Sequence, residues 1–301
     1  MDIPVSVQNS AVPYGPGSQP EEQDGSALDI LQLPNGMMTF SLPDLPEADD
    51  VTRLSEAKQV LEKLLSKMQQ YDLSCPSIRI DISHLDELNK QMVDQVLGEG
   101  EVSVVFTPET LSEQGIQRIE IQEAVLAGIW RIKSLGEDNQ LISDEIEVAS
   151  IPDIVLSQSF NVAEPQIIGD KQPIPKGVLN APPLIAEIND KIKQFKHESN
   201  NIKINGHVIN LSLLPQTAED ISFLSDRLGT GVCTILSRGY GNCRISSTAT
   251  HNVWWVQYFN SQDTNILNSL EIIDVPNVAC AAQEDIEDST QRLEEILEAY
   301  R

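Results

Sequence analysis

Residues 97–106, LGEGEVSVVF, recur 131 positions later as LGTGVCTILS at 228–237. Each segment has a leucine, two glycines one residue apart, and then an apolar run typical of a β-strand. Glycine just past a helix adopts the left-handed conformation that ends it. Both segments therefore predict a helix end followed by a strand, and their similarity predicts that one folding unit occurs twice.

The sequence upstream of each segment extends this repeat. Apolar residues at helical spacing predict an amphipathic helix over 54–68 and another over 185–195. After each helix, strict alternation of apolar residues predicts a half-buried strand, at 78–82 in copy one and at 209–213 in copy two. These two strands are again 131 residues apart.

Each predicted strand leads into a second helix. Ser83-x-x-Asp86 and Thr217-x-x-Asp220 resemble the capping boxes that open helices. Beyond the glycines, copy one continues with the strand patterns EVSVVF, QRIEI and AGIWRI, and copy two with VCTILS, NCRISST and NVWWVQYF. The later patterns match at an offset of 124 residues, so seven residues are lost between the first two strands of copy two.

These patterns predict an α+β fold of two tandem related α/β units, with antiparallel sheets and flanking helices. A Pro-rich and acidic stretch, residues 1–50, is predicted to be a disordered tail. We expect the first repeat at 51–157, a Pro-rich linker at 158–182, and the second repeat at 183–301. Copy two has an additional final helix, predicted from apolar residues between 286 and 300.

Composition limits the classes of function. The 301 residues include 46 acidic and 20 basic side chains, a net charge of −26. Such a charge repels nucleic acid and anionic lipid and attracts basic partners; solubility alone is the alternative explanation of the charge. The chain lacks an apolar run of about 18 residues, and its N-terminus does not resemble a secretory signal. We therefore expect a cytoplasmic protein without membrane insertion, and its four scattered cysteines fit a reducing compartment.

The most distinctive chemistry lies at 237–259 in copy two, SRGYGNCRISSTATHNVWWVQYF. Arg238–Gly241 separates two strand patterns, which indicates a hairpin turn rather than a phosphate-binding loop. The cysteines lack the close spacing of metal ligands, and no catalytic triad pattern is present. Cys243 stands beside Arg244, whose charge would lower the pKa of an accessible thiol; a buried, inert thiol is the alternative.

Alternation divides the aromatic strand at 252–259 into two faces. Trp254 and Tyr258 point one way, and Trp255 and Phe259 the other. One face is expected to pack on helices. The other face either binds a partner, since Trp, Tyr and Arg are favoured at interfaces, or is buried as well.

The segment 235–276 closely resembles the signature of the HupH/HyaF family of hydrogenase expression and formation proteins. The matching runs are RGYG-x-CR at 238–244, NVW-x-VQYFN at 252–260, and D-x-x-ILN-x-LE-x-x-DVP at 263–276. The acidic PDLPEAD stretch at 43–49 and the two-copy layout are also similar to the family.

This resemblance implies a non-catalytic accessory protein for uptake nickel–iron hydrogenase, without a cofactor. It implies a chaperone that binds the small-subunit precursor, with its iron–sulfur clusters and twin-arginine signal, and other hydrogenase maturation proteins are further candidate partners. A thiol-dependent redox or iron–sulfur handling factor using Cys243 is the alternative. The residues expected to bind the partner are Arg238, Tyr240, Asn242, Cys243, Arg244, Trp254 and Tyr258.

Overall fold

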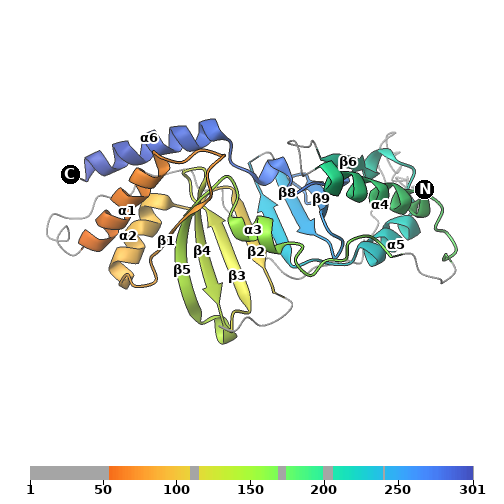
Figure 1. Ribbon diagram of the computed structural model, residues 1–301, viewed down its shortest axis with the longest axis horizontal. Helices are drawn as coiled ribbons and strands as arrows, with labels where there is room; N and C mark the ends of the chain where they lie inside the picture. Colours follow the sequence, from red (N-terminus) through yellow and green to blue (C-terminus); the bar gives the residue numbers. More distant parts are fainter. Residues whose placement is uncertain (1–53, 109–114, 169–173, 199–205, 240, 301) are drawn as a thin grey trace, which may run out of the picture. The chain divides into compact units, whose positions relative to one another are not determined.

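A computed structural model describes residues 54–108, 115–168, 174–198, 206–239 and 241–300 (Figure 1). The predicted tail, residues 1–50, lies outside the described residues. The helices are α1 (Ser55–Met68), α2 (Glu87–Leu97), α3 (Asp153–Gln158), α4 (Ala181–Glu198), α5 (Ala218–Leu228) and α6 (Gln283–Ala299). The strands are β1 (Ile78–Asp81), β2 (Val102–Phe106), β3 (Arg118–Glu123), β4 (Ile129–Leu135), β5 (Leu141–Val148), β6 (His207–Asn210), β7 (Cys233–Ser237), β8 (Asn242–Ser247), β9 (Val253–Phe259) and β10 (Asn265–Ile272).

These ten strands form one antiparallel sheet in the order β1-β5-β4-β3-β2-β7-β8-β9-β10-β6. The predicted α+β fold with two tandem units is confirmed, because each half of the sheet repeats the same strand order with its own helices. The sequence patterns did not predict that the two halves join. They join through β2 and β7, which pair in the middle of the sheet.

The β2–β7 pair relates the two copies by a local twofold axis. Val104 pairs with Ile235, and these residues are also equivalent positions of the repeat, 131 residues apart. On one side of this pair, Phe106 pairs with Cys233, which is the equivalent of Val102. On the other side, Val102 pairs with Ser237, which is the equivalent of Phe106. Each copy therefore contributes the same surface to this contact. Such an isologous contact is typical of a twofold dimer, and here it occurs within one chain.

The structure explains why both positions of the repeated LGxG segment are glycine. Gly98 and Gly229 follow α2 and α5 with φ angles of 58° and 66°, which confirms the predicted helix ends. The second glycine of each pair sits against the neighbouring backbone. A β-carbon at Gly100 would collide with the carbonyl of Ala124, and one at Gly231 would collide with the equivalent segment of copy two.

One of the two predicted capping boxes is present. Thr217 accepts a hydrogen bond from the backbone N–H of Asp220 (3.0 Å), and the Asp220 carboxylate accepts one from the Thr217 N–H (3.1 Å). The prediction for Ser83 is wrong, because Asp86 caps α2 by accepting from the N–H of Asn89 (2.8 Å). Asp86 and Thr217 are 131 residues apart, as are the glycines at the other ends of these helices.

The two edge strands, β1 and β6, are equivalent as predicted, but their residues match with a shift of two positions from the predicted alignment. Ile80 pairs with Ile146 in copy one, and Ile209 pairs with Leu270 in copy two, so the strand offset is 129 rather than 131. The second half of the strand predicted in copy two is instead a 3-10 turn, η2 (Leu211–Leu213). Copy two has two more residues between edge strand and helix cap, and this turn accommodates them.

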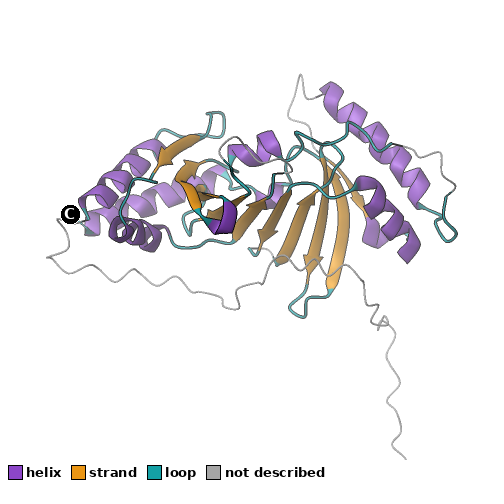
Figure 2. Cartoon of the chain, turned by 90° about the horizontal axis from the view of Figure 1, so that it is seen from below, coloured by secondary structure: helices purple, strands orange, loops and turns teal. Residues whose placement is uncertain are grey.

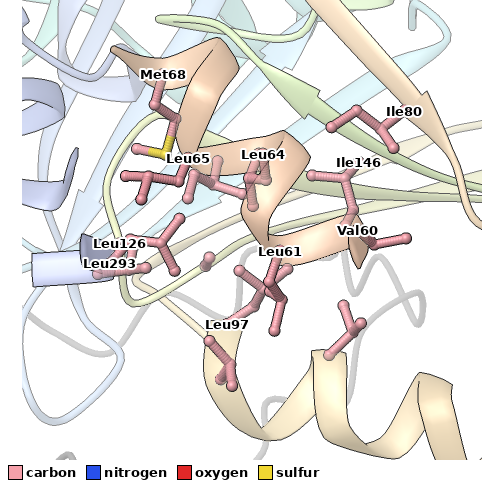
Figure 3. Packing of buried hydrophobic residues seen from close by; sticks show 14 of the residues in the cluster. Val60, Leu61, Leu64, Leu65, Met68, Ile80, Leu97, Leu126, Ile146 and Leu293 are labelled. Carbon is pink, nitrogen blue, oxygen red and sulfur yellow. The ribbon is translucent and has the colours of Figure 1, made fainter. Parts of the chain in front are cut away.

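Helices α1, α2 and α6 at one end of the sheet and α4 and α5 at the other end pack on the same face (Figures 1 and 2). In copy one, α1 buries its apolar stripe against Ile80 and Ile146 of the sheet and against Leu97 of α2 (Figure 3). In copy two, α4 and α5 pack over Ile209 and Leu270. The ladder register places Ile146 and Leu270 on one face, since every intervening pair aligns.

The final helix of copy two packs against copy one. Leu293 of α6 is fully buried in the cluster with Leu61 and Leu64 of α1. This packing places α6, the last helix of the chain, in the core of copy one. The domain boundaries expected from the sequence stay a prediction.

The opposite sheet face carries a second apolar cluster. It contains Trp130 of copy one and Trp254 of copy two, and it is covered by α3, Phe160 and the 3-10 turn η3 (Asn277–Ala279). Among the described residues, no helix is long and apolar enough to span a membrane.

Candidate functional site: the open centre of the sheet

The helix-bearing face is only half-covered across its middle. Strands β2, β3, β7 and β8 alternate strictly between buried and half-exposed side chains. The half-exposed set points to the side of the helices, between the two helix groups. We call this surface the central face; its residues are Ser103, Val105, Arg118, Glu120, Gln122, Thr234, Leu236, Asn242, Arg244, Ser246, Trp255, Gln257 and Phe259.

Arg244 lies over an aromatic ring on this face. Its guanidinium carbon is 5.5 Å from the centre of the Phe259 ring, within the range of a cation–π contact. The equivalent of Arg244 in copy one is Glu120, which forms a 2.9 Å ion pair with Arg118. Within the described part of the chain, no carboxylate lies within ion-pair distance of Arg244. The twofold-related faces of the two copies thus differ in charge.

Trp255 and Gln257 complete the aromatic and amide character of this face. Both are half-exposed, and the indole N–H of Trp255 donates to the side-chain oxygen of Asn268 on β10. Sequence reasoning left open which side of β9 was uncovered. The alternation separates the two sides, but the placement of α3 and Phe160 over Trp254 decides which one is covered.

Trp254, one of the seven residues predicted to contact a partner, is a core residue. Its side chain is fully buried, and its indole N–H donates to the carbonyl of Asp274 (3.0 Å). The Phe160 ring meets it edge-on at 5.1 Å. Trp130 occupies the equivalent place in copy one, fully buried and donating to the carbonyl of Ala149 (2.8 Å). A side chain common to both cores supports the fold rather than a function of copy two.

Cys243 is also buried, on the face opposite to Arg244. Burial raises the pKa of its thiol to about 11, and the neighbouring Tyr258 hydroxyl only partly offsets this effect. Of the two alternatives for Cys243, the structure has the buried thiol, because successive side chains of a strand point to opposite faces and Arg244 lies on the other one. Burial likewise raises the pKa of Cys233 to about 12 and of Cys280 to about 11. These three thiols are protonated at neutral pH and are poor nucleophiles.

The other predicted residues are divided between the two faces and the turn. Tyr258 is half-buried beside Cys243, and burial raises the pKa of its hydroxyl to about 12. Asn242 is half-exposed on the central face, and Arg238 is exposed in the turn that joins β7 to β8. Tyr240 lies outside the described residues. The structure thus brings Asn242 and Arg244 together on one surface, and the partner-binding role of the seven residues stays a prediction.

Two pockets flank α3 on the opposite face. One, of about 390 Å³, is lined by residues that include Phe160, His251 and Asp274. The other, of about 450 Å³, is lined mainly by apolar side chains, and the charged residues Arg79 and Asp153 also line it. None of the six predicted residues that the structure describes lines either pocket.

Comparison with known proteins shows the family. The C-terminal conserved region of the HupH hydrogenase expression protein matches twice, at residues 54–166 and 178–300. The chain is 45% identical to the hydrogenase expression/formation protein HoxQ of Cupriavidus necator, over 94% of each chain. It is 40% identical to HupH of Rhodobacter capsulatus over 96% of this chain and 97% of that one. It is 29% identical to the hydrogenase-1 operon protein HyaF of Escherichia coli over 94% and 93%. The chain therefore belongs to the HupH family of hydrogenase expression proteins.

Proposed function

We propose that this protein is a cytoplasmic assembly chaperone in hydrogenase maturation, which binds the small-subunit precursor before its twin-arginine export. The relatives named as hydrogenase expression/formation proteins support a maturation role. The single observation that carries the binding role is the central face, where aromatic, amide and arginine side chains lie half-exposed in the middle of the sheet. Such side chains are the preferred anchors of protein interfaces.

The distribution of the family signature supports binding rather than catalysis. Arg244, Gln257 and Phe259 of the signature project onto the central face, while Trp254 and Cys243 support the core beneath it. Binding also agrees with the charge. A protein of net charge −26 attracts a precursor that carries a cationic signal segment.

The thiol-dependent alternative receives less support. A thiol carrier needs an accessible sulfur with a lowered pKa, and burial raises the pKa of Cys243 to about 11. We therefore expect Cys243→Ser to retain binding of the client, provided that the variant folds.

The test uses two matched pairs of residues. Arg244 stacks on Phe259 on the central face, and Arg227 stacks on Phe223 (4.8 Å) on α5. Binding of the purified full chain to a small-subunit precursor is measured by surface plasmon resonance. Arg244→Ala with Phe259→Ala should weaken binding by about tenfold or more, as loss of an interface anchor does.

Arg227→Ala with Phe223→Ala is the control and should leave the affinity nearly unchanged. Equal effects of the two double variants would remove the central face from the proposal. Absence of binding to any hydrogenase small-subunit precursor would overturn the chaperone function itself.

A further inference from the structure

The smaller of the two pockets beside α3 is lined by a residue whose place in the repeat can be identified. Asn252 directly precedes β9, and Gly128 directly precedes β4, 124 residues earlier. The carbonyl groups of both residues accept the same backbone hydrogen bond from the end of the neighbouring strand, at 3.0 Å in each copy. Asn252 and Gly128 are therefore equivalent positions, and the two copies can be compared at this pocket.

In copy one, α6 and the segment before it close this place. A β-carbon at Gly128 would lie 2.5 Å from the side chain of Ile286, so no side chain fits there. Ser150, the equivalent of Asp274, exchanges two hydrogen bonds with Ala281, at 2.7 and 2.9 Å. Helix α6 belongs to the core of copy one (Figure 1). The equivalent place in copy two is a pocket of about 390 Å³.

The side chains at this place also differ between the copies. Asn252 has a φ angle of 62°, a left-handed conformation that Gly128 adopts without strain at 78°. The side-chain amide of Asn252 donates to Oδ1 of Asp274 (3.2 Å), and both residues line the pocket. An asparagine at a position where glycine is more favourable indicates a use for its side chain, and the fold of copy one forms without it.

The pocket combines a carboxylate with polar and aromatic side chains. Asp274 is exposed, and in the described part of the chain no lysine or arginine lies within ion-pair distance of its carboxylate. Ser157 and Asn161 contribute a hydroxyl and an amide, and Phe160 and Phe195 contribute aromatic rings. A planar cation is the ligand that these groups suit together.

We propose that this pocket binds the side chain of an arginine in a basic partner segment. The edge of a guanidinium donates two parallel hydrogen bonds to a carboxylate such as that of Asp274, and its faces stack on aromatic rings. A lysine carries the same charge but lacks the planar group. The acidic chain, with 46 acids and 20 bases, attracts such a segment.

The pocket is distinct from the central face, because none of the residues of that face lines it. Its volume of about 390 Å³ lies within the range of about 300–1,000 Å³ that is usual for ligand pockets. If the arginine belongs to the cationic signal segment of the client, the pocket is a second contact with the precursor. That consequence rests on the proposed function, and the pocket itself does not.

The test uses three alanine-flanked peptides that carry arginine, lysine or citrulline at the central position. Citrulline keeps the shape of arginine without its charge. Each peptide is titrated into the nitrogen-15-labelled full-length protein at about 0.15 M salt, where attraction is screened beyond about 8 Å. NMR records the backbone N–H signals of Asn161, Asn252 and Asp274. We expect saturable shifts with the arginine peptide, affinity about fivefold lower with the lysine peptide, and no shift with the citrulline peptide.

Three variants locate the binding. Asp274→Asn keeps the shape of the side chain, removes its charge, and should weaken binding by about fivefold or more. Asp226→Asn removes an equal charge from the exposed surface of α5 and should leave the affinity unchanged. Asn252→Gly reproduces the glycine of copy one, so it should fold like the parent protein, and it should weaken binding by about threefold, read at Asn161 and Asp274.

Three outcomes would overturn the proposal. The first is the absence of saturable shifts at the pocket with millimolar arginine peptide. The second is an equal affinity for the arginine and lysine peptides, which would show a non-selective cation site. The third is an equal loss of binding in Asp274→Asn and Asp226→Asn, which would show general attraction to an acidic protein. The peptide comparison needs no variant, and no hydrogenase precursor enters it, so a failure here is separable from a failure of the chaperone function.

Discussion

The guanidinium carbon of Arg244 lies 5.5 Å from the centre of the Phe259 ring, although the adjacent Cys243 is buried on the other side of the sheet. One dipeptide of the family signature thus serves two faces. Cys243 fills the core that holds the strands, and Arg244 presents charge on the central face. Substitutions at neighbouring positions should therefore separate effects on stability from effects on binding.

Arg244→Ala and Arg238→Ala should affect binding more than stability. Arg238 is exposed and Arg244 half-exposed, so each variant should unfold within about 2 °C of the parent protein. Binding to the small-subunit precursor should weaken by about fivefold or more for Arg244→Ala. Differential scanning calorimetry and surface plasmon resonance measure the two effects. Loss of folding without a separate binding defect would show that these arginines are structural.

The adjacent tryptophans should behave in opposite ways. Trp254→Ala should lower the free energy of unfolding by about 3–5 kcal/mol, because the side chain is fully buried and donates to Asp274. Trp130→Ala, its equivalent in copy one, should cost a similar amount. Trp255→Ala should cost less and should weaken client binding instead. Urea unfolding measures the stabilities, and equal costs at 254 and 255 would contradict this division.

The residues that were predictable from sequence are those whose signals are local. The helix ends at Gly98 and Gly229 and the capping box at Thr217 followed from neighbours a few residues away. The pairing of Val104 with Ile235 did not, because a strand pattern shows which side chains share a face but not which strand lies alongside. For the same reason the sequence names Trp254 among the predicted partner-binding residues, whereas the structure buries Trp254 and leaves Trp255 half-exposed.

Asp220 should be a major anchor of the segment that leads into α4. Its buried carboxylate accepts hydrogen bonds from the backbone N–H groups of Leu179, Asn180 and Ala181 at 2.8–2.9 Å, besides capping α5. Burial alone would raise its pKa, but these donors hold the pKa well below the ordinary value. Asp220→Ala should lower the free energy of unfolding by about 2–4 kcal/mol, measured by urea titration at pH 7.

Asp86→Ala is the matched control for that substitution. Asp86 caps α2 by accepting from Asn89 and does not anchor a second segment as Asp220 does, so the loss should be about 1 kcal/mol. The stabilisation by Asp220 is present above the ordinary carboxyl pKa and is lost as pH falls through the lowered one. A cost for Asp220→Ala no larger than for Asp86→Ala would contradict the anchoring role.

Glu123 should make the protein less stable as the pH rises. Burial raises the pKa of its carboxyl to about 7, and the neighbouring Glu101 and Asp285 add to this effect. The folded protein therefore holds this proton more tightly than the unfolded chain does. The stabilisation is complete below the ordinary pKa near 4.5 and is lost as pH rises through about 7.

Glu123→Gln keeps the shape and removes the titration. The difference in unfolding free energy between parent and variant should change by about 2–3 kcal/mol from pH 5 to pH 8, with the variant gaining relative stability at high pH. Urea titrations at both pH values measure this difference. A difference that stays constant with pH would show that Glu123 does not titrate in this range.

Salt should slow the association of the small-subunit precursor much more than it changes its dissociation. The net charge of −26 and a cationic signal segment attract each other over a distance set by the Debye length. That length falls from about 30 Å at 0.01 M salt to about 8 Å at 0.15 M, so the long-range attraction that accelerates encounter is screened. The short-range contacts of Arg244 and Phe259 are screened less and govern dissociation. Phe259→Ala should therefore raise the dissociation rate and leave the salt dependence of association unchanged. Surface plasmon resonance at the two salt concentrations separates the rates, with a precursor that lacks its signal segment as the control. Salt-independent association of the intact precursor would exclude electrostatic steering, whereas steering that persists without the signal segment would assign the attraction to another part of the client.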